Sequence, residues 1–436
     1  MKNGNQNEIK WYETLTFKMA LLGIMAIMFL LPLELISTVI RERAANSLTV
    51  QEQISEEWGK KQTVSGPVLN IPVRRTNYSA DGKASLFETT WHIMPEELEI
   101  NGILSPQIRY KGIYESIIYE TELSLSGTFE IAVEKPDPGL EIMWEDAYYT
   151  LGVSDNRGIM KDPVMKISGS SVSARPGVAD HDLFDSGLTY PVAMNEGQGS
   201  LVFDLQLALR GSSGLFFAPA GKSTYVSIES SWDAPSFTGN YLPGERSVGD
   251  EGFEAIWHIT HLNRNFPQSW YGSVHKPEEE SFGVNLILEV DHYRKAERSA
   301  KYGLLFIAFT FLVLLFLEIS SNKRLHLFHY FLVSLALVLF FSLLNALSEH
   351  TGFNPAYIIS ALSTIALLTF FTGSLLKKAR YVIMVSGMLT ALYVFIYVLL
   401  ALNEFAYLAG NIGLFIALAA IMYLSAKTNL FGKSSI

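Results

Sequence analysis

Long apolar runs lie at the start and at the end of this 436-residue chain, and a long segment of mixed composition separates them. A helix of roughly 20 apolar residues can cross the ~30 Å hydrocarbon core of a bilayer. Six runs meet this requirement, at about 17–36, 302–319, 327–347, 355–376, 381–402 and 405–425. The pattern predicts a membrane protein with one transmembrane helix, a large inserted domain and five further transmembrane helices.

Between residues 64 and 300 the pattern changes to alternating apolar and polar positions, as in "LFETTWHI", "LVFDLQLALRG" and "STYVSIESSW". A period of two is typical of half-buried strands, and turn clusters such as "SADGK" and "LPGE" separate the segments. We expect a mostly-β domain, either a sandwich of two packed sheets or two β subdomains divided near residues 136–165. Only "MPEELEI" (94–100) and the region around 178–186 favour helix.

The first apolar run is predicted to be an uncleaved signal anchor rather than a cleaved signal peptide. Its apolar core exceeds the roughly 7–15 residues of a signal peptide, and no small-residue cleavage site follows "LPLELISTVI". Pro and Gly are then absent until Gly59, so residues 37–63 are expected to extend the helix beyond the membrane.

The distribution of Lys and Arg in the short loops predicts the orientation. Basic loops lie on the cytoplasmic side of membrane proteins, and the alternate loops "SEHTGFN" and "NE" contain no Lys or Arg. The tails at 1–16 and 426–436 are therefore expected in the cytoplasm, and residues of about 37–300 on the opposite side. The basic residues that decide this are Lys2, Lys10, Lys18, Lys323, Arg324, Lys377, Lys378, Arg380, Lys427 and Lys433.

The amino-acid composition excludes disulfide bonds and argues against nucleic-acid binding. The chain has no cysteine, so the inserted domain cannot be held together by disulfides even in an oxidising compartment. Residues 37–300 carry 22 Lys and Arg against 37 Asp and Glu. A domain this acidic is not expected to bind nucleic acid.

A basic cluster of Arg294, Lys295, Arg298 and Lys301 directly precedes the second apolar run. It is expected outside the cytoplasm, near the lipid headgroups, which long translocated domains permit. Glu297 lies four residues before Lys301, a spacing that allows an ion pair on one helix. We expect this segment to run unbroken into the second transmembrane helix and to couple the β domain to the membrane.

The segment from Trp232 to Trp270 is unusually rich in aromatic, amide and guanidinium side chains. Such mixtures bind sugars or peptides in grooves, because rings stack on the ligand and polar groups orient it. The alternative is that the rings fill the β core while Gly, Pro and Asn form loops. The candidate binding residues are Trp232, Asn240, Arg246, Trp257, His258, Arg264, Gln268 and Trp270.

No pattern in the chain indicates catalysis, a metal or a cofactor. His258 and His261 form an H-x-x-H pair, but residues three apart on a strand point to opposite faces. The G-x-S-x-G and H-E-x-x-H motifs of hydrolases are absent. Acidic pairs such as Asp180 and Asp182 lie in turn-like segments and are interpreted as solvated. We therefore expect a protein that is not an enzyme.

Ionisable residues inside a membrane mark ion or substrate paths, and the C-terminal runs contain almost none. Glu318 lies at a helix end near Arg324, and Asn345 is a polar residue within the third run. A transporter or a lipid-handling protein, with the helices as its working part, is the alternative function.

Two segments, "FETTWHI" at 87–93 and "FEAIWHI" at 253–259, share five residues at matching positions. An internal duplication would explain this, but neighbouring strand-like segments occur in a different order around the two copies. Coincidence of strand patterning is the other interpretation.

Several long stretches resemble the CreD family of bacterial inner-membrane proteins, also called cell envelope integrity proteins. They include "GPVLNIPV", "RYKGIYESIIYETELSLSGTF", "SWDAPSFTGNYLP", "GFEAIWHITHLNRNFPQSW" and "LHLFHYFLVSLALVLFFSLLNALSEHTGFNPAYIIS". The resemblance implies an envelope protein controlled by a two-component system and linked to colicin tolerance and the response to β-lactams. It implies no catalytic residues.

Together these patterns predict a multi-pass protein of the cytoplasmic (inner) membrane with a periplasmic β domain. Its expected partners are the lipid bilayer and a periplasmic protein or a component of the cell wall. Its expected role is non-enzymatic support of envelope integrity under stress.

Overall fold

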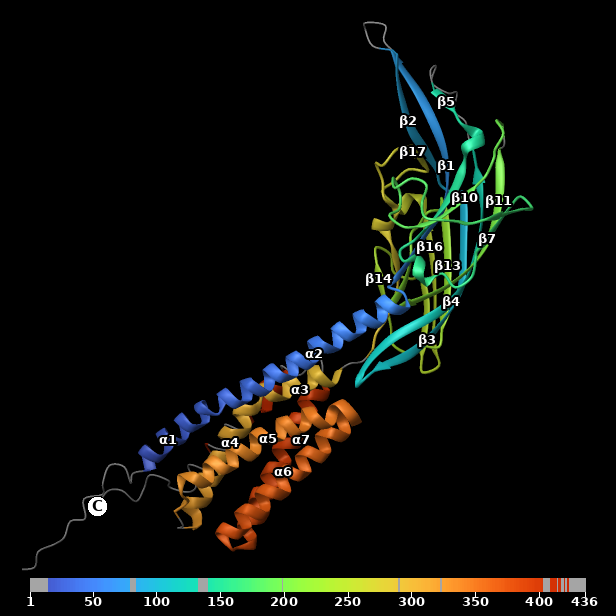
Figure 1. Ribbon diagram of the computed structural model, residues 1–436. Coiled ribbons are helices and arrows are strands. Elements are labelled where there is room, and N and C mark those ends of the chain that lie inside the picture. Colours follow the sequence, from blue (N-terminus) through green and yellow to red (C-terminus); the bar gives the residue numbers. More distant parts are fainter. Residues whose placement is uncertain are drawn as a thin grey trace, which may run out of the picture. The chain divides into compact units, whose positions relative to one another are not determined.

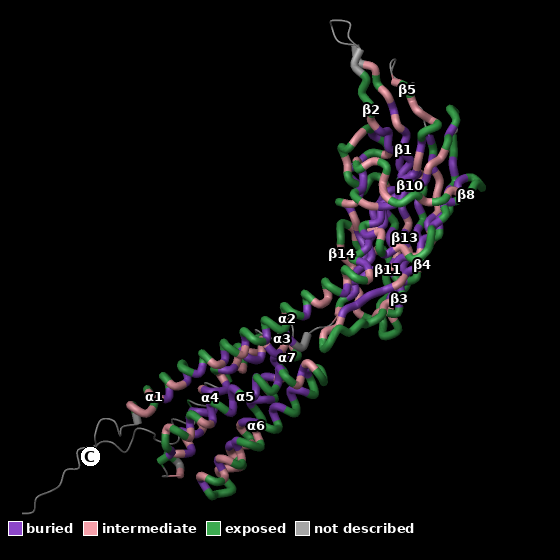
Figure 2. Tube along the Cα trace, in the orientation of Figure 1, coloured by how far each residue is buried: buried purple, intermediate pink, exposed green. Residues whose placement is uncertain are grey.

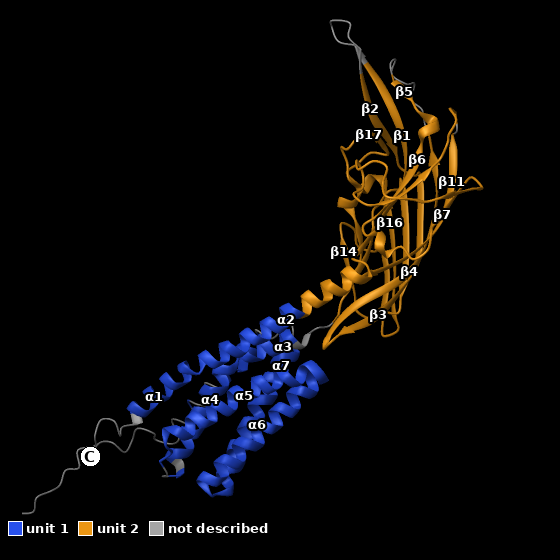
Figure 3. Ribbon diagram, viewed as in Figure 1, with its two compact units in different colours: residues 1–46, 289–436 blue, residues 47–288 orange. Residues whose placement is uncertain are grey.

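The computed structural model describes residues 15–78, 84–131, 140–197, 199–288, 291–321 and 324–402, with short pieces between 408 and 422. The chain forms two compact units (Figure 3). The helical unit contains residues 1–46 and 289–436, and the β unit contains residues 47–288.

Seven helices are assigned in the described part of the chain (Figure 1). They are α1 (Leu15–Met28), α2 (Leu30–Trp58), α3 (Asp291–Lys301), α4 (Gly303–Ser321), α5 (Leu327–Thr351), α6 (Phe353–Leu376) and α7 (Ala379–Ala401). The segment Thr16–Trp58 and the helices α5, α6 and α7 are each long and apolar enough to cross a membrane. The bent pair of α3 and α4 would make a fifth span.

The six predicted spans are thus only partly reproduced. About half of the predicted helix at 405–425 lies outside the described residues, and the described pieces within it, such as 408–413, are helical. The expectation that the basic cluster runs unbroken into the next span is wrong, because α3 and α4 meet at 43°. The residue after the break, Gly303, lies so close to Leu33 of α2 that an added Cβ would meet the leucine methyl group at 2.6 Å. This close contact and the change from a half-polar to an apolar helix coincide with the bend.

The described residues of the β unit form two sheets. The first has the order β14 (Pro235–Gly239), β18 (Phe282–Leu286), β12 (Gly214–Phe217), β1 (Gln62–Tyr78), β6 (Tyr148–Val153), β10 (Gly187–Pro191) and β9 (Arg175–Pro176). In this sheet β2 (Ala84–Ile93) and β5 (Leu140–Ile142) also pair with β1, and β17 (Ser269–Tyr271) pairs with β2. The second has the order β15 (Glu245–Gly249), β16 (Gly252–Thr260), β13 (Ser223–Ser230), β3 (Glu97–Lys111), β4 (Tyr114–Glu130), β11 (Ser200–Ser212), β7 (Val164–Ile167) and β8 (Ser170–Ser173). Short 3-10 turns occur at Trp144–Asp146, Asn156–Gly158, His261–Asn263 and Pro277–Glu280.

The sheets share one hydrophobic core, which corresponds to the predicted sandwich rather than to two subdomains. Along β11 the residues Phe203 and Leu205 are buried while Val202 and Asp204 are exposed, as the alternation predicts. Phe129 of the second sheet packs against Tyr149 of the first with ring centroids 5.1 Å apart. Figure 2 shows this core as the buried, purple positions of the β unit.

The two segments that favoured helix in this unit are not helical. Residues 97–100 begin β3, where Leu98 and Ile100 are buried and Glu97 and Glu99 are exposed, so the period is that of a strand. Residues 178–186 form turns, and the Asp180 carboxylate accepts a hydrogen bond from the Asp182 amide at 2.8 Å. A short side chain that bonds its own backbone competes with helix formation.

The two similar segments lie in different sheets. The first is on β2, which pairs with β1 and β17, and the second is on β16, which pairs with β13 and β15. His92 of the first copy is buried and His258 of the second is exposed. The shared Phe and His therefore have different environments in the two copies, whereas the shared Trp and Ile are buried in both.

Candidate functional site

The predicted binding residues divide into buried and exposed groups. Trp257 and Trp270 are only 1% and 7% exposed and belong to the core. The ring of Trp257 packs against Phe282 and Phe237, and its Nε1 donates to the Tyr241 carbonyl oxygen at 3.3 Å. These two rings therefore lie where the core interpretation places them.

Arg264 and Gln268 form part of a buried polar cluster. The Arg264 guanidinium lies 4.3 Å from the centre of the Phe266 ring and donates to Gln268 Oε1. Gln268 Nε2 donates to the carbonyl oxygens of Met94 and Pro95 at 2.9 and 2.7 Å. Burial lowers the pKa of Arg264 to about 10, and the nearby Glu280 carboxylate opposes this shift. The cluster fixes the loop after β16 to the start of β3.

The other candidates lie closer to the surface. Asn240, Arg246 and His258 are exposed and Trp232 is half-buried. His258 Nε2 lies 3.1 Å from Ser223 Oγ, and the Arg246 guanidinium lies 6.0 Å from the Phe237 ring. Trp232 Nε1 donates to the Ile287 carbonyl oxygen at 3.2 Å. Of the eight candidates, these four and the half-buried Gln268 keep surface that a partner can contact.

Sequence reasoning missed a pocket of about 400 Å³ beside β2 and the segment after β17. Exposed apolar side chains lie on these same elements: Phe87 is 58% exposed, Tyr271 47% and Val274 71%. The lining includes Pro72, Phe87, Thr90, Asp180, Asp182 and Gly272. Alternation along β2 could have placed Thr90 and His92 on one face, but no pattern pairs this strand with a turn 90 residues later.

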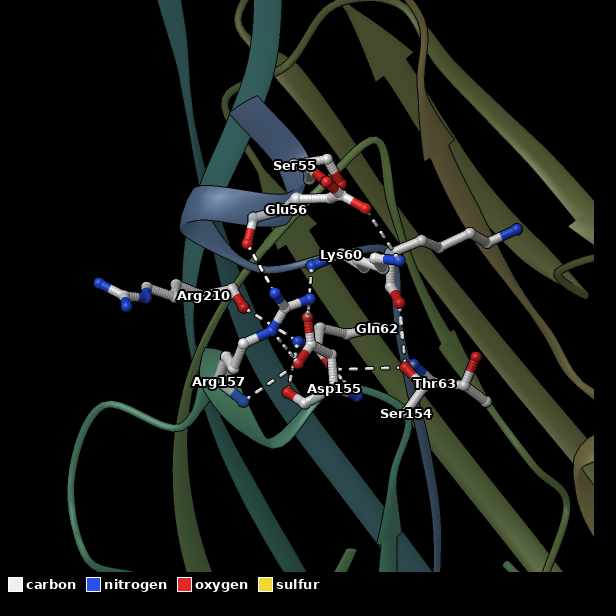
Figure 4. Close-up of polar contacts among 11 residues, drawn as sticks. Ser55, Glu56, Lys60, Gln62, Thr63, Ser154, Asp155, Arg157 and Arg210 are labelled. Carbon is white, nitrogen blue, oxygen red and sulfur yellow. Dashed lines mark hydrogen bonds and ion pairs between the residues drawn. The ribbon is translucent and has the colours of Figure 1, made fainter. Parts of the chain in front are cut away.

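The C-terminal end of α2 is bonded to β11 and to the turn Asn156–Gly158 of the β unit (Figure 4). Ser55 Oγ lies 2.6 Å from Ser212 Oγ, and Arg157 Nη1 donates to the Glu56 carbonyl oxygen at 2.8 Å. The Asp155 carboxylate accepts from the Lys60 amide at 3.0 Å and from the Arg157 guanidinium at 2.9 Å. The helix end is therefore fixed to the β unit by several hydrogen bonds.

Gln62 and Trp58 extend this contact. The buried amide of Gln62 donates to the carbonyl oxygens of Asp155 and Arg210 at 3.1 and 3.2 Å. The indole of Trp58 donates to the Tyr119 carbonyl oxygen at 3.4 Å, and the Arg210 guanidinium lies 4.9 Å from its ring. Burial raises the pKa of Asp155, but hydrogen bonds from Arg157 and from the Lys60 amide lower this pKa by a larger amount. The net shift of the pKa is therefore downward.

The basic cluster lies on α3. The predicted ion pair between Glu297 and Lys301 is confirmed, with a distance of 3.2 Å. Arg298 Nη2 donates to the Leu399 carbonyl oxygen of α7 at 3.4 Å. Arg294 and Lys301 are exposed, and Lys295 is half-buried. The cluster is thus the polar face of a helix whose other face packs within the helical unit.

Polar residues also lie inside the helical unit. Asn345 of α5 is 8% exposed, and its Oδ1 finds no hydrogen-bond partner among the described residues. One turn later Glu349 forms a 3.9 Å ion pair with Arg43 of α2. The sequence identified Asn345 as a polar residue within a transmembrane run, but it did not predict the ion pair of Glu349.

Comparison with known proteins identifies the family to which the chain belongs. The family model described as "Inner membrane protein CreD" matches residues 14–431. The chain is also 29% identical over 431 residues to the inner membrane protein CreD of Escherichia coli (strain K12). That alignment covers 96% of this chain and 94% of the relative, and so includes both units. Both comparisons confirm the resemblance found in the sequence.

Proposed function

Because the chain belongs to the CreD family of inner membrane proteins, we propose that it supports cell envelope integrity under stress without acting as an enzyme. Its helices hold it in the cytoplasmic membrane of a bacterium, with both termini in the cytoplasm and residues of about 37–300 in the periplasm. There the β unit binds a periplasmic protein or a component of the cell wall.

The observation that carries this proposal is the surface formed by β2 and the segment around β17. It combines the exposed apolar side chains of Phe87, Tyr271 and Val274 with a pocket of about 400 Å³. Exposed aromatic residues beside a concave polar site are typical of binding surfaces. The partner is expected to place an apolar group against these side chains and a polar group in the pocket.

The hydrogen bonds at the end of α2 support mechanical coupling between partner binding at the β unit and the helices. The helix α2 extends from Leu30 to Trp58, and its last turn is bonded to β11 and to the turn Asn156–Gly158. We therefore expect movement of these elements to be transmitted to the helix. The basic cluster on α3 provides the second covalent connection. When the partner binds the β unit, both connections then transmit this event to the helical unit.

Site-specific photocrosslinking in cells tests the proposal. A photoreactive residue at Phe87 or Val274 is expected to give one discrete crosslinked species. The control position is Val202, which is 56% exposed on the second sheet and should not give that species. Equal products from all three positions, or none from Phe87 and Val274, would contradict partner binding at this surface.

Asn345 and Glu349 favour the alternative, a transporter or lipid-handling protein that works through its helices. A buried polar atom without a partner is unfavourable in a membrane and often marks a functional site. If this alternative holds, Asn345→Leu abolishes envelope-stress tolerance and Phe87→Ser does not. The envelope-partner proposal predicts the reverse, with both variants present at normal levels in the membrane.

A further inference from the structure

The imidazole of His92 is held in one tautomer by its neighbours. His92 lies on β2 and is only 1% exposed, and its Nδ1 lies 2.7 Å from Asn70 Oδ1. The Asn70 amide group is oriented because its Nδ2 donates to the Val68 carbonyl oxygen and to Thr150 Oγ1, at 3.1 and 2.8 Å. Oδ1 therefore accepts, and the proton resides on Nδ1. This leaves an unprotonated lone pair on Nε2.

That lone pair points toward carboxylates and not toward a donor. Nε2 has no hydrogen-bond partner among the described residues, and Asp182 Oδ2 lies 3.6 Å away. Two acceptors that face each other at a partly buried site are unfavourable unless a cation or a hydrogen-bond donor lies between them.

A second carboxylate completes the cluster. Asp180 accepts from Thr90 Oγ1 at 2.6 Å and from the Asp182 amide at 2.8 Å, which fixes both of its oxygens. One ligand atom each from His92, Asp180 and Asp182 can be chosen so that all three lie within 4.8 Å of one another. Both carboxylates line the 400 Å³ pocket, so the cluster is reachable from solvent.

We propose that His92 Nε2 and the carboxylates of Asp180 and Asp182 bind a divalent transition-metal ion, with Zn²⁺ as the representative. Metal–ligand bonds of about 2.0–2.2 Å place neighbouring ligand atoms of a tetrahedral site roughly 3.3 Å apart. The 3.6 Å between Nε2 and Oδ2 needs only a small movement to reach this value. The hydrogen bond from His92 Nδ1 to an oxygen acceptor is the usual way in which proteins orient a metal-binding histidine.

The donor set also selects the class of ion. An imidazole nitrogen with two carboxylates suits Zn²⁺ and its neighbours, whereas Ca²⁺ and Mg²⁺ prefer oxygen ligands alone. Three protein ligands leave at least one coordination position for water or for an oxygen of a bound molecule. No metal site was expected from the sequence, because residues three apart on a strand point to opposite faces and because Asp180 and Asp182 lie in a turn-like segment interpreted as solvated. Here the ligands come from a strand and a distant turn.

Calorimetric titration of the full-length protein in detergent tests this inference. The protein carries no polyhistidine tag and is treated with a chelator, and ZnCl₂, CaCl₂ and MgCl₂ are then titrated separately. We expect one Zn²⁺ per chain and binding of Ca²⁺ and Mg²⁺ at least about tenfold weaker. Asp182→Asn keeps the side-chain shape and should weaken Zn²⁺ binding at least about tenfold.

Asp185→Asn is the matched control, because Asp185 lies in the same turn region but its side chain is 87% exposed. It should bind Zn²⁺ as the unaltered protein does. As a second readout, Zn²⁺ should raise the thermal unfolding midpoint of the unaltered protein and of Asp185→Asn, but not of Asp182→Asn. Absence of stoichiometric Zn²⁺ binding, equal binding by Asp182→Asn, or equally strong binding of Ca²⁺ or Mg²⁺ would each overturn the inference.

Discussion

Lys18 Nζ lies 2.5 Å from both carboxylate oxygens of Glu318, although 300 residues separate the two in the sequence. The hydroxyl group of Tyr330, which is fully buried, donates to the same carboxylate at 2.9 Å, and Lys18 also donates to the Leu325 carbonyl oxygen. The pair connects α1 with α4 inside the helical unit. Sequence reasoning had grouped Glu318 with the cations of the following loop.

Removing either partner of this pair should destabilise the helical unit. The side chains of Lys18 and Glu318 are 19% and 12% exposed, so each single alanine variant leaves a largely buried charge. We expect a loss of about 3–5 kcal/mol in the free energy of unfolding. Thermal unfolding in detergent measures it, and the exchanged pair Lys18→Glu with Glu318→Lys should recover more than half of the loss. The control is Glu122→Ala, which breaks an exposed ion pair and should have an effect below about 1 kcal/mol.

The contact between the end of α2 and the β strands should weaken in acid. The pKa of Asp155 is lower in the folded protein than the ordinary value of 3.8, so its contribution to stability is complete above that value. The contribution is lost as the pH falls further, through the lowered folded pKa. Hydrogen exchange of the amides at 55–62 should therefore show protection that decreases below pH 3.8.

Asp155→Asn should reduce the same protection already at neutral pH, because the amide cannot replace the charged hydrogen bonds to Arg157. Asp204→Asn, on the exposed face of β11, is the control and should not change it. Protection of 55–62 that is identical in Asp155→Asn would show that this carboxylate does not hold the helix end.

Substitutions in the aromatic-rich segment should separate core residues from surface residues. Trp257→Ala removes a fully buried ring and is expected to lower the free energy of unfolding by about 3–5 kcal/mol. Arg246→Ala, at an exposed position, should change it by less than about 0.5 kcal/mol. Denaturation followed by circular dichroism measures both. Comparable losses in the two variants would contradict the burial of Trp257.

Flexible insertions test the proposed mechanical coupling. A Gly/Ser linker between Asn46 and Ser47 interrupts α2, and the same linker after Ala300 interrupts α3. Each should reduce envelope-stress tolerance at a normal protein level, and the α2 insertion more strongly because that helix is bonded directly to β strands. The linker after Asp250, in the exposed turn between β15 and β16, is the control. Unchanged tolerance with both helix insertions would exclude rigid coupling.

The parts of the structure that depend on local patterns were predictable from the sequence. Apolar length gave the positions of α5, α6 and α7, and period-two alternation gave strands such as β11 and β13. The bend after Lys301 was not predictable, because no Pro marks it and the contact of Gly303 with Leu33 is tertiary. The order of the strands in the sheets was also not predictable, since β1 pairs in parallel with β12, which lies about 150 residues later in the chain.

The same limit explains the candidate sites. The composition of their segment made Trp257 and Arg264 candidate binding residues. In the structure both side chains are buried, whereas Arg246 and Asn240 are exposed. His92 and Asp182 come together only because a turn packs against β2. Such contacts between distant segments leave no periodic signal in one sequence.

Because the natural chain has no cysteine, labelling of single introduced cysteines tests the proposed orientation most directly. Spheroplasts carrying Ser247→Cys, in the exposed strand β15, or Ser434→Cys, in the C-terminal tail, are treated with a maleimide that cannot cross membranes. We expect labelling of Ser247→Cys in intact spheroplasts and of Ser434→Cys only after the membrane is permeabilised. Labelling of the tail in intact spheroplasts, or protection of Ser247→Cys until permeabilisation, would contradict a periplasmic β unit.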